Sequence, residues 1–105
     1  MRELLALDEL PDGVVCYNDP VAAGALKAIL EAGLRVPQDI AVIGAGNVHY
    51  SDLLRVSLST VDQNSTGIGE SAADLLLELL KAPEPPKPRV IVIEAKVRER
   101  DSTRR

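Results

Sequence analysis

The 105-residue chain has the length of one domain, and its 46% hydrophobic and 27% charged residues are typical of a folded globular protein. Its only aromatic residues are two tyrosines, so the core must be aliphatic, and few rings are present on which the bases of a single-stranded nucleic acid stack. The net charge of −4 argues against direct nucleic-acid binding, and the single cysteine, Cys16, excludes an internal disulfide and a multi-cysteine metal site.

Residues 1–10 do not predict a secretory signal peptide. The apolar run within residues 1–10 is too short for a secretory signal and includes acidic Glu3, and residues 2–8 predict the last turns of a helix. No stretch reaches the ~18 apolar residues of a membrane-spanning helix. We therefore expect a cytoplasmic protein with no membrane partner. Near the other end, Glu99 and Asp101 interrupt the basic residues, which predicts a solvated strand and tail rather than a nucleic-acid-binding arm.

The first half of the chain has the pattern of a strand, a helix and a second strand. Residues 14–17 are a short β-rich run, which predicts a buried strand. A helix follows, with Asp19 as its expected N-cap, Pro20 at its first position and Gly33 just beyond its end. Residues 40–43 predict a second buried strand. Two strands joined by a helix within about 30 residues form a parallel βαβ unit with a right-handed crossover.

The second half of the chain predicts a strand, a long helix and a final strand. Residues 48–56 predict an irregular segment with one helical turn, and 58–61 predict a short strand. A helix is expected over 65–80, and a proline-rich, stiff linker over 83–88. The run Arg-Val-Ile-Val-Ile-Glu at 89–94 predicts a buried or edge strand.

The 65–80 helix is apolar around most of its circumference. The apolar residues leave only a narrow polar strip, which consists of Glu70, Asp74, Glu78 and Lys81. Such a helix needs packing partners on two sides, and we expect the chain to self-associate through it, unless the helix folds back and is covered within one chain.

Polar side chains follow the first two predicted strands at the point where each strand ends. Asn18 and Asp19 follow the first strand, and Asn47 follows the second. In parallel sheets these positions share one edge, where ligands bind, so a carboxylate and an amide there can hydrogen-bond the hydroxyls of a ligand. The alternative is that Asp19 only caps its helix and Asn47 only turns the chain.

Other motifs in the chain predict no catalytic, metal or cofactor site. Gly44 and Gly46 lack the third glycine of a dinucleotide-binding loop, since position 49 is a histidine. His49, Ser51 and Asp52 are the residue types of a hydrolytic triad, but neighbours so close in sequence rarely converge in that geometry. His49 has no partner for a metal ion, and Cys16 is expected in the core. We expect no enzymatic activity.

Several motifs along nearly the whole chain resemble the effector-binding domain of LacI/GalR-family transcription regulators. They include a strand ending in Asn-Asp, a Val-Pro-x-Asp connector before a Val-Ile-Gly strand, a Leu-Ser-Thr-Val-x-Gln segment and a terminal Arg-Asp-Ser-Thr. In this chain they lie at Asn18-Asp19, Ala22 to Gly24, Gly33 to Pro37, Asp39-Ile40, Val42 to Gly44, Leu58 to Gln63, Ile68 to Leu80, and Arg100 to Thr103.

The resemblance implies part of a fold in which two α/β lobes close on a small molecule. The expected fold class is α/β, a parallel-sheet βαβ lobe of a periplasmic-binding-protein-like fold. Residues 1–62 are expected to form the βαβ segment of the C-terminal lobe, and 63–82 a crossing helix that packs on the other lobe. A proline-rich linker at 83–88 and a final strand with a polar tail at 89–105 complete the expected division.

The resemblance also implies roles for individual residues. Asp19 corresponds to a residue that hydrogen-bonds ligand hydroxyls, and Asn18 to one that braces its turn. Gln63, near the crossing between lobes, is a further candidate for the cleft. The family has an aromatic residue and an aspartate after Val-Ile-Gly, whereas this chain has Ala45, Gly46 and Asn47. That departure puts ordinary sugar specificity in doubt.

The expected function is therefore to sense a small-molecule, sugar-like effector within a LacI/GalR-type regulator, without a cofactor. DNA would be bound only through a helix-turn-helix headpiece that this chain lacks. A fragment of a periplasmic-type solute-binding protein is the first alternative, since it shares the fold. A small enzyme of flavodoxin-like architecture is the second, and the chain has no assembled catalytic constellation to support it.

Overall fold

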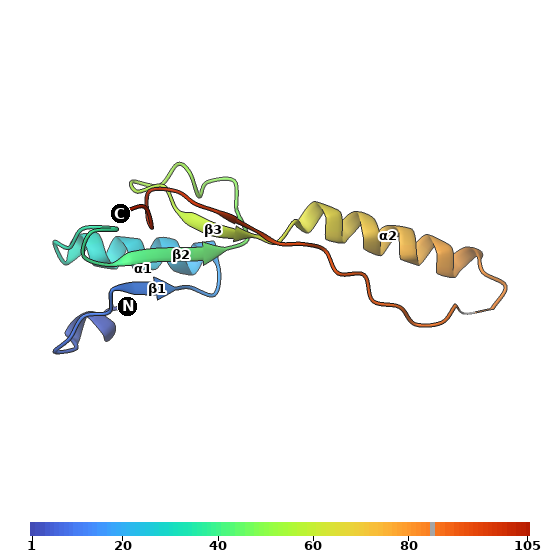
Figure 1. Ribbon diagram of the computed structural model, residues 1–105, viewed down its shortest axis with the longest axis horizontal. Helices are drawn as coiled ribbons and strands as arrows, with labels where there is room; N and C mark the ends of the chain where they lie inside the picture. The colour runs from blue at the N-terminus through green and yellow to red at the C-terminus, as the bar shows by residue number, and fades with distance from the viewer. Residues whose placement is uncertain (85) are drawn as a thin grey trace.

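The computed structural model describes residues 1–84 and 86–105. The structure confirms, to within two residues, the predicted strands at 40–43 and 58–61 and the predicted helix at 65–80. The end of an α-helix predicted at 2–8 is wrong, because this segment contains only a short 3-10 helix. Along the described residues the elements are η1 (Leu4–Ala6), β1 (Gly13–Val15), α1 (Asp19–Glu31), β2 (Ala41–Ala45), β3 (Ser59–Asp62), α2 (Ser65–Lys81) and β4 (Lys96–Arg98) (Figure 1).

The strands form one sheet in the order β1-β2-β3-β4. β1, β2 and β3 are parallel, with Val14 opposite Val42 and Gly44 opposite Thr60, whereas β4 runs antiparallel to β3. The predicted parallel βαβ unit is therefore confirmed, and the carboxyl ends of β1, β2 and β3 share one edge of the sheet (Figure 1).

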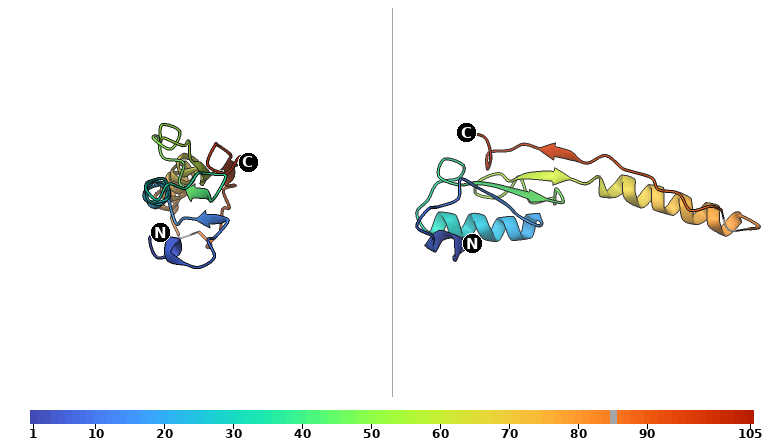
Figure 2. Two further views of the ribbon diagram at one scale, coloured as in Figure 1. Left: turned by 90° about the vertical axis from the view of Figure 1, so that its left-hand side faces the viewer. Right: turned by 60° about the horizontal axis from the view of Figure 1, so that its bottom comes forward.

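The core is aliphatic, as expected, and lies where α1 packs on one face of the sheet (Figure 2). The absence of a side chain at Gly44 in β2 allows a close approach to α1: a Cβ on Gly44 would stand 3.1 Å from the Cα of Asp19. Cys16 is buried in this core, which confirms the prediction, and its burial raises the pKa of the thiol. The buried apolar residues are Cys16, Ala22, Ala25, Leu26, Ile29, Val36, Ile40, Val42 and Leu58.

β1 is an edge strand with one open face, so its predicted burial is wrong. Val15 is 85% exposed and Tyr17 is 89% exposed, whereas Val14 and Cys16 point toward the core. Successive strand residues face opposite sides of a sheet, and in the described part of the chain only the α1 side of β1 is covered. A run of apolar residues therefore does not show that both faces of a strand are packed.

The N-cap of α1 is Asn18 rather than the predicted Asp19. The Oδ1 of Asn18 accepts a hydrogen bond of 2.9 Å from the amide of Val21, and Asp19 is already the first helical residue. Both residue types cap helices well, but the carboxylate of Asp19 is held by the loop that follows β2, as described below.

The predicted strand at 89–94 is wrong. The regular strand lies farther along the chain, at Lys96–Arg98, where β3 supplies a hydrogen-bonding partner. The earlier residues run alongside α2 with no neighbouring strand among the described residues, and β structure requires one. The predicted linker at 83–88 includes Pro85, which lies outside the described residues.

The C-terminal tail is anchored, contrary to the predicted solvated tail. Ser102 is fully buried, and its hydroxyl donates to the carbonyl of Val42 at 2.6 Å and accepts from the amide of Ser59 at 2.8 Å. Its own carbonyl accepts from the amide of Val42 at 2.9 Å. The tail thus joins β2 to β3 where these strands begin, and Arg105 adds a hydrogen bond to the carbonyl of Pro37.

α2 and the chain that returns from it form an arm that projects from the sheet (Figures 1 and 2). The molecule measures 63 × 26 × 19 Å, and α2 has no buried residue. Leu76, Leu77 and Leu80 are at least half exposed, which agrees with the expectation that this helix needs further partners. None of the described helices has the length and apolar character required to cross a bilayer.

Candidate functional site

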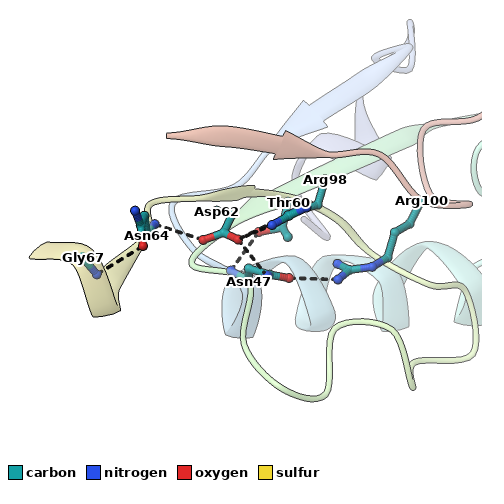
Figure 3. A network of polar contacts seen from close by, with 7 residues as sticks. All are labelled: Asn47, Thr60, Asp62, Asn64, Gly67, Arg98 and Arg100. Carbon is teal, nitrogen blue, oxygen red and sulfur yellow. Dashed lines mark hydrogen bonds and ion pairs between the residues drawn. The ribbon is translucent and has the colours of Figure 1, made fainter. Parts of the chain in front are cut away.

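A network of polar side chains lies at the carboxyl edge of the sheet (Figure 3). Asn47 stands in the turn after β2, and Asp62 ends β3. Arg98 in β4 and Arg100 beyond it approach from the C-terminal part of the chain. The network therefore brings together residues that are up to 53 positions apart in sequence.

Asp19 lies beneath this network and is completely buried. Its Oδ2 accepts hydrogen bonds from the amide of Val48 at 2.9 Å and from the hydroxyl of Ser51 at 2.8 Å. Its Oδ1 accepts from the hydroxyl of Thr60 at 2.6 Å. Both oxygens are thus engaged within the protein, and the carboxylate holds the loop after β2 against β3.

Asn47 occupies a tight turn in which its backbone is left-handed, with φ 49°. Asparagine tolerates this conformation better than most residues, and the preceding Gly46 also has a positive φ of 118°. The amide of Asn47 donates to the hydroxyl of Thr60 at 3.2 Å. Thr60 in turn donates to Asp19, so Asn47 and Asp19 lie at one edge, as predicted, and share a hydrogen-bonded neighbour.

The side chain of Asn47 forms hydrogen bonds with both Asp62 and Arg100. Its Nδ2 donates to Oδ2 of Asp62 at 3.2 Å, and its Oδ1 accepts from the guanidinium of Arg100 at 2.8 Å. The same guanidinium donates to the carbonyl of Leu58 at 2.6 Å. Asn47 is half-buried, so these contacts are only partly screened by water.

Asp62 is the acidic centre of the network. Its Oδ1 accepts from the amide of Asn64 at 3.0 Å, and its Oδ2 accepts from the guanidinium of Arg98 at 3.2 Å. The backbone hydrogen bond from Asn64 lowers the pKa of the Asp62 carboxyl most, and Arg98 and Asn47 lower it further. A small cleft of about 190 Å³ opens beside it, lined by Asp62, Asn64, Glu94, Lys96 and Arg98.

Two of the predicted site residues, Asn18 and Gln63, take no part in the polar network of Figure 3. Asn18 caps α1 with its side chain, and Gln63 is exposed next to Asp62. Sequence reasoning missed Asp62, although it follows a strand at the same edge as Asn18 and Asn47, and the same rule would have found it. It also missed Arg98 and did not assign Arg100 of the terminal Arg-Asp-Ser-Thr motif to the site, because the pairing of β4 with β3 brings both residues to the edge only in the folded chain.

The residue types of a hydrolytic triad do not converge. Ser51 is buried and donates to Asp19, whereas His49 is exposed and packs edge-to-face against Tyr50 with ring centroids 5.3 Å apart. Among residues 1–84 and 86–105, no three His, Cys, Asp or Glu side chains are grouped as metal ligands. The chemistry available at the edge is hydrogen bonding by amides, carboxylates and guanidinium groups.

Comparisons with known proteins agree with this architecture. The family described as periplasmic binding protein-like domains matches residues 1–103. The chain is 40% identical over 109 aligned residues to the HTH-type transcriptional repressor PurR of Glaesserella parasuis serovar 5, an alignment that covers 99% of this chain and 32% of that repressor. The chain thus spans about a third of the length of this curated relative.

Two solved structures are also similar. A LacI family transcriptional regulator from Arthrobacter sp. FB24, in complex with lactose, is 36% identical with a TM-score of 0.81, covering 89% of this chain and 35% of that one. A LacI family regulator from Lactobacillus casei with bound glucose is 28% identical with a TM-score of 0.81, covering 96% of this chain and 36% of that one.

Proposed function

The chain belongs to the periplasmic binding protein-like family, and we propose that it acts as the effector-sensing part of a LacI/GalR-type transcription regulator. The observation that carries this proposal is the polar network at the carboxyl edge of the sheet, where parallel α/β sheets bind ligands. The relatives are transcriptional regulators, so a periplasmic-type solute-binding protein is not favoured, and neither is an enzyme.

We assign the effector to the class of small polyhydroxylated molecules. Similar regulators were solved with lactose and with glucose, and the edge offers complementary groups. Asp62 accepts hydrogen bonds, Arg98 donates them, and the amides of Asn47 and Gln63 do both. Such mixed donors and acceptors suit hydroxyl groups better than a fully charged ligand, because Asp62 and Arg98 at this edge already form an ion pair with each other.

The roles of Asn18, Asp19, Asn47 and Gln63 in binding stay predictions. In this structure Asp19 presents no exposed oxygen. It contributes to the proposed site by fixing the backbone of Val48 and, through Thr60, the turn at Asn47. Direct contact between Asp19 and a ligand hydroxyl would require one of its three donors to move away.

The proposed regulation uses two lobes. Residues 1–62 would form the βαβ segment of one lobe and 63–82 a helix that crosses to the other, with a linker at 83–88 and a returning segment at 89–105. An effector that contacts both lobes shifts the population toward one relative orientation. DNA would be read by a separate headpiece in the cytoplasm. Self-association through α2 is part of this proposal, because that helix is the largest exposed apolar element.

Titration of the 105-residue chain with lactose and with glucose, followed by two-dimensional amide NMR, tests the proposal. We expect saturable, millimolar binding with shifts concentrated at Asn18, Asn47, Asp62 and Gln63. Asn47→Ala should weaken the shifts, whereas Gln38→Ala, an exposed polar position in the connector before β2, should not. Shifts that are linear in concentration and scattered over the surface for both sugars would contradict the assignment to this class of effector.

A further inference from the structure

The side-chain amide of Asn47 lies between two ionised groups of opposite charge (Figure 3). Its Oδ1 accepts from the guanidinium of Arg100 at 2.8 Å, and its Nδ2 donates to Oδ2 of Asp62 at 3.2 Å. A guanidinium can only donate hydrogen bonds, and an ionised carboxylate can only accept them. Both contacts therefore require the same orientation of the amide, with its oxygen toward Arg100 and its nitrogen toward Asp62.

Both neighbours of this amide are also held by the backbone of β3 and its surroundings. The guanidinium of Arg100 donates to the carbonyl of Leu58 at 2.6 Å, just before β3 begins. Oδ1 of Asp62 accepts from the amide of Asn64 at 3.0 Å, just after β3 ends. The gap that the side chain of Asn47 spans is therefore set by the fold around it.

Asparagine fits this gap better than the other residue of the same shape. Aspartate also tolerates the left-handed backbone of position 47, where φ is 49°. Its carboxylate would still accept from Arg100, but it would place a second acceptor at the point where the amide nitrogen now donates to Asp62. An amide satisfies both neighbours, whereas a carboxylate satisfies only one of them.

The charges of the network and of the cleft beside it balance when position 47 carries an amide. The acids, with the buried carboxylate beneath, are Asp19, Asp62 and Glu94, and the bases are Lys96, Arg98 and Arg100. A carboxylate at position 47 would make this edge negative and would lie beside the carboxylate of Asp62. Like charges so close disfavour the ionised form of one of the two acids.

We propose that residue 47 determines the charge of the ligand that this edge accepts, and that asparagine selects an uncharged, hydroxylated molecule. The proposal rests on the effector class proposed above and assigns its selectivity to one side chain. A cation loses more hydration than an uncharged ligand does, and a neutral edge offers no net negative charge that offsets this loss. Arg100 is a positioning residue here, since it acts on the ligand through Asn47.

Titration of the carboxyl groups by carbon-13 NMR of the full chain tests the bridge without a ligand. In Asn47→Asp, one of the two facing acids should bind its proton about tenfold or more tightly than Asp62 does in the wild type. Adding Asp62→Asn should remove this effect, because the pair again holds one acid and one amide. Gln38→Glu, the same change of charge at an exposed position, should alter the proton affinity of Asp62 less than about twofold. An Asn47→Asp chain without a more tightly bound proton would overturn the proposal.

Glucose and protonated glucosamine test the selectivity by two-dimensional amide NMR, because they differ only by an ammonium group in place of one hydroxyl. Asn47→Asp should change the ratio of the two dissociation constants about tenfold in favour of glucosamine. The variant that carries both Asn47→Asp and Asp62→Asn has a neutral edge again and should restore the wild-type ratio.

Two results of the sugar titrations would overturn the selectivity. They are an unchanged ratio in Asn47→Asp, and a ratio that the added Asp62→Asn does not restore. A wild-type chain that binds neither sugar refutes the proposed function and the selectivity with it. An unchanged proton affinity in Asn47→Asp refutes the bridge alone, so the two failures are distinguishable.

Discussion

Replacement of Asp19 by alanine should cost much of the stability of the chain. The carboxylate is fully buried and accepts hydrogen bonds from the amide of Val48 and the hydroxyls of Ser51 and Thr60. Alanine leaves these three donors without an acceptor in a buried place, and Ser51 and Thr60 are themselves fully buried. The loss of Asp19 therefore affects α1, the loop after β2 and β3 together.

The magnitude follows from the three lost bonds. A hydrogen bond to a charged group contributes about 1.5–3 kcal/mol, and a buried donor left without an acceptor costs about 1–3 kcal/mol. The three donors belong to one network, so these contributions are not additive. A domain of this size has a free energy of unfolding of about 5–15 kcal/mol. We expect Asp19→Ala to lose about 3–5 kcal/mol. Asp19→Asn should lose less, about 1–2 kcal/mol, because its amide oxygen still accepts from part of the network.

Urea unfolding followed by far-ultraviolet circular dichroism measures the effect, since the chain has no tryptophan for fluorescence. One low protein concentration should be used throughout, because self-association raises apparent stability. Asp52→Ala, at an exposed position in the same loop, is the control and should stay within about 0.5 kcal/mol of wild type. An Asp19→Ala chain within about 1 kcal/mol of wild type, with an unchanged m-value, would refute the reasoning.

Three further substitutions test the packing and the charges. Gly44→Ala should destabilise by about 1–3 kcal/mol, since its Cβ would clash with the carboxylate Oδ1 of Asp19 and stand 3.1 Å from the Cα of Asp19; the urea midpoint should fall, and the loss should shrink in an Asp19→Ala background, which removes the carboxylate. Ser102→Ala should cost about 1–3 kcal/mol, because its buried hydroxyl joins β2 and β3; an unchanged midpoint would contradict this. The guanidinium and the amide of Arg35 lower the pKa of Asp39 from 3.8 to about 2. This contribution to stability is complete above the unfolded value and is lost as the pH falls through about 2, so acid titration of Asp39→Asn should show a shallower loss of stability there.

The sequence by itself determined the order and type of most elements. Apolar periodicity and turn residues are local properties, so the helices after Asn18 and Asn64 and the strands at 40–43 and 58–61 were found within two residues. The parallel arrangement followed too, because a short strand-helix-strand unit has few alternatives. The rule that ligands bind at strand carboxyl ends also predicted Asn47 at the polar edge.

The tertiary structure alone decided which polar residues meet and which apolar residues are covered. Asp19 meets Thr60 across 41 positions, and Arg100 meets Asn47 across 53, and no local pattern encodes such pairs. The segment at 89–94 has strand composition, yet it forms no strand, because β structure requires a hydrogen-bonding neighbour and none of the described strands lies beside it. Ser102, in a polar tail, is buried because the starts of β2 and β3 leave amide and carbonyl groups that its hydroxyl and backbone satisfy.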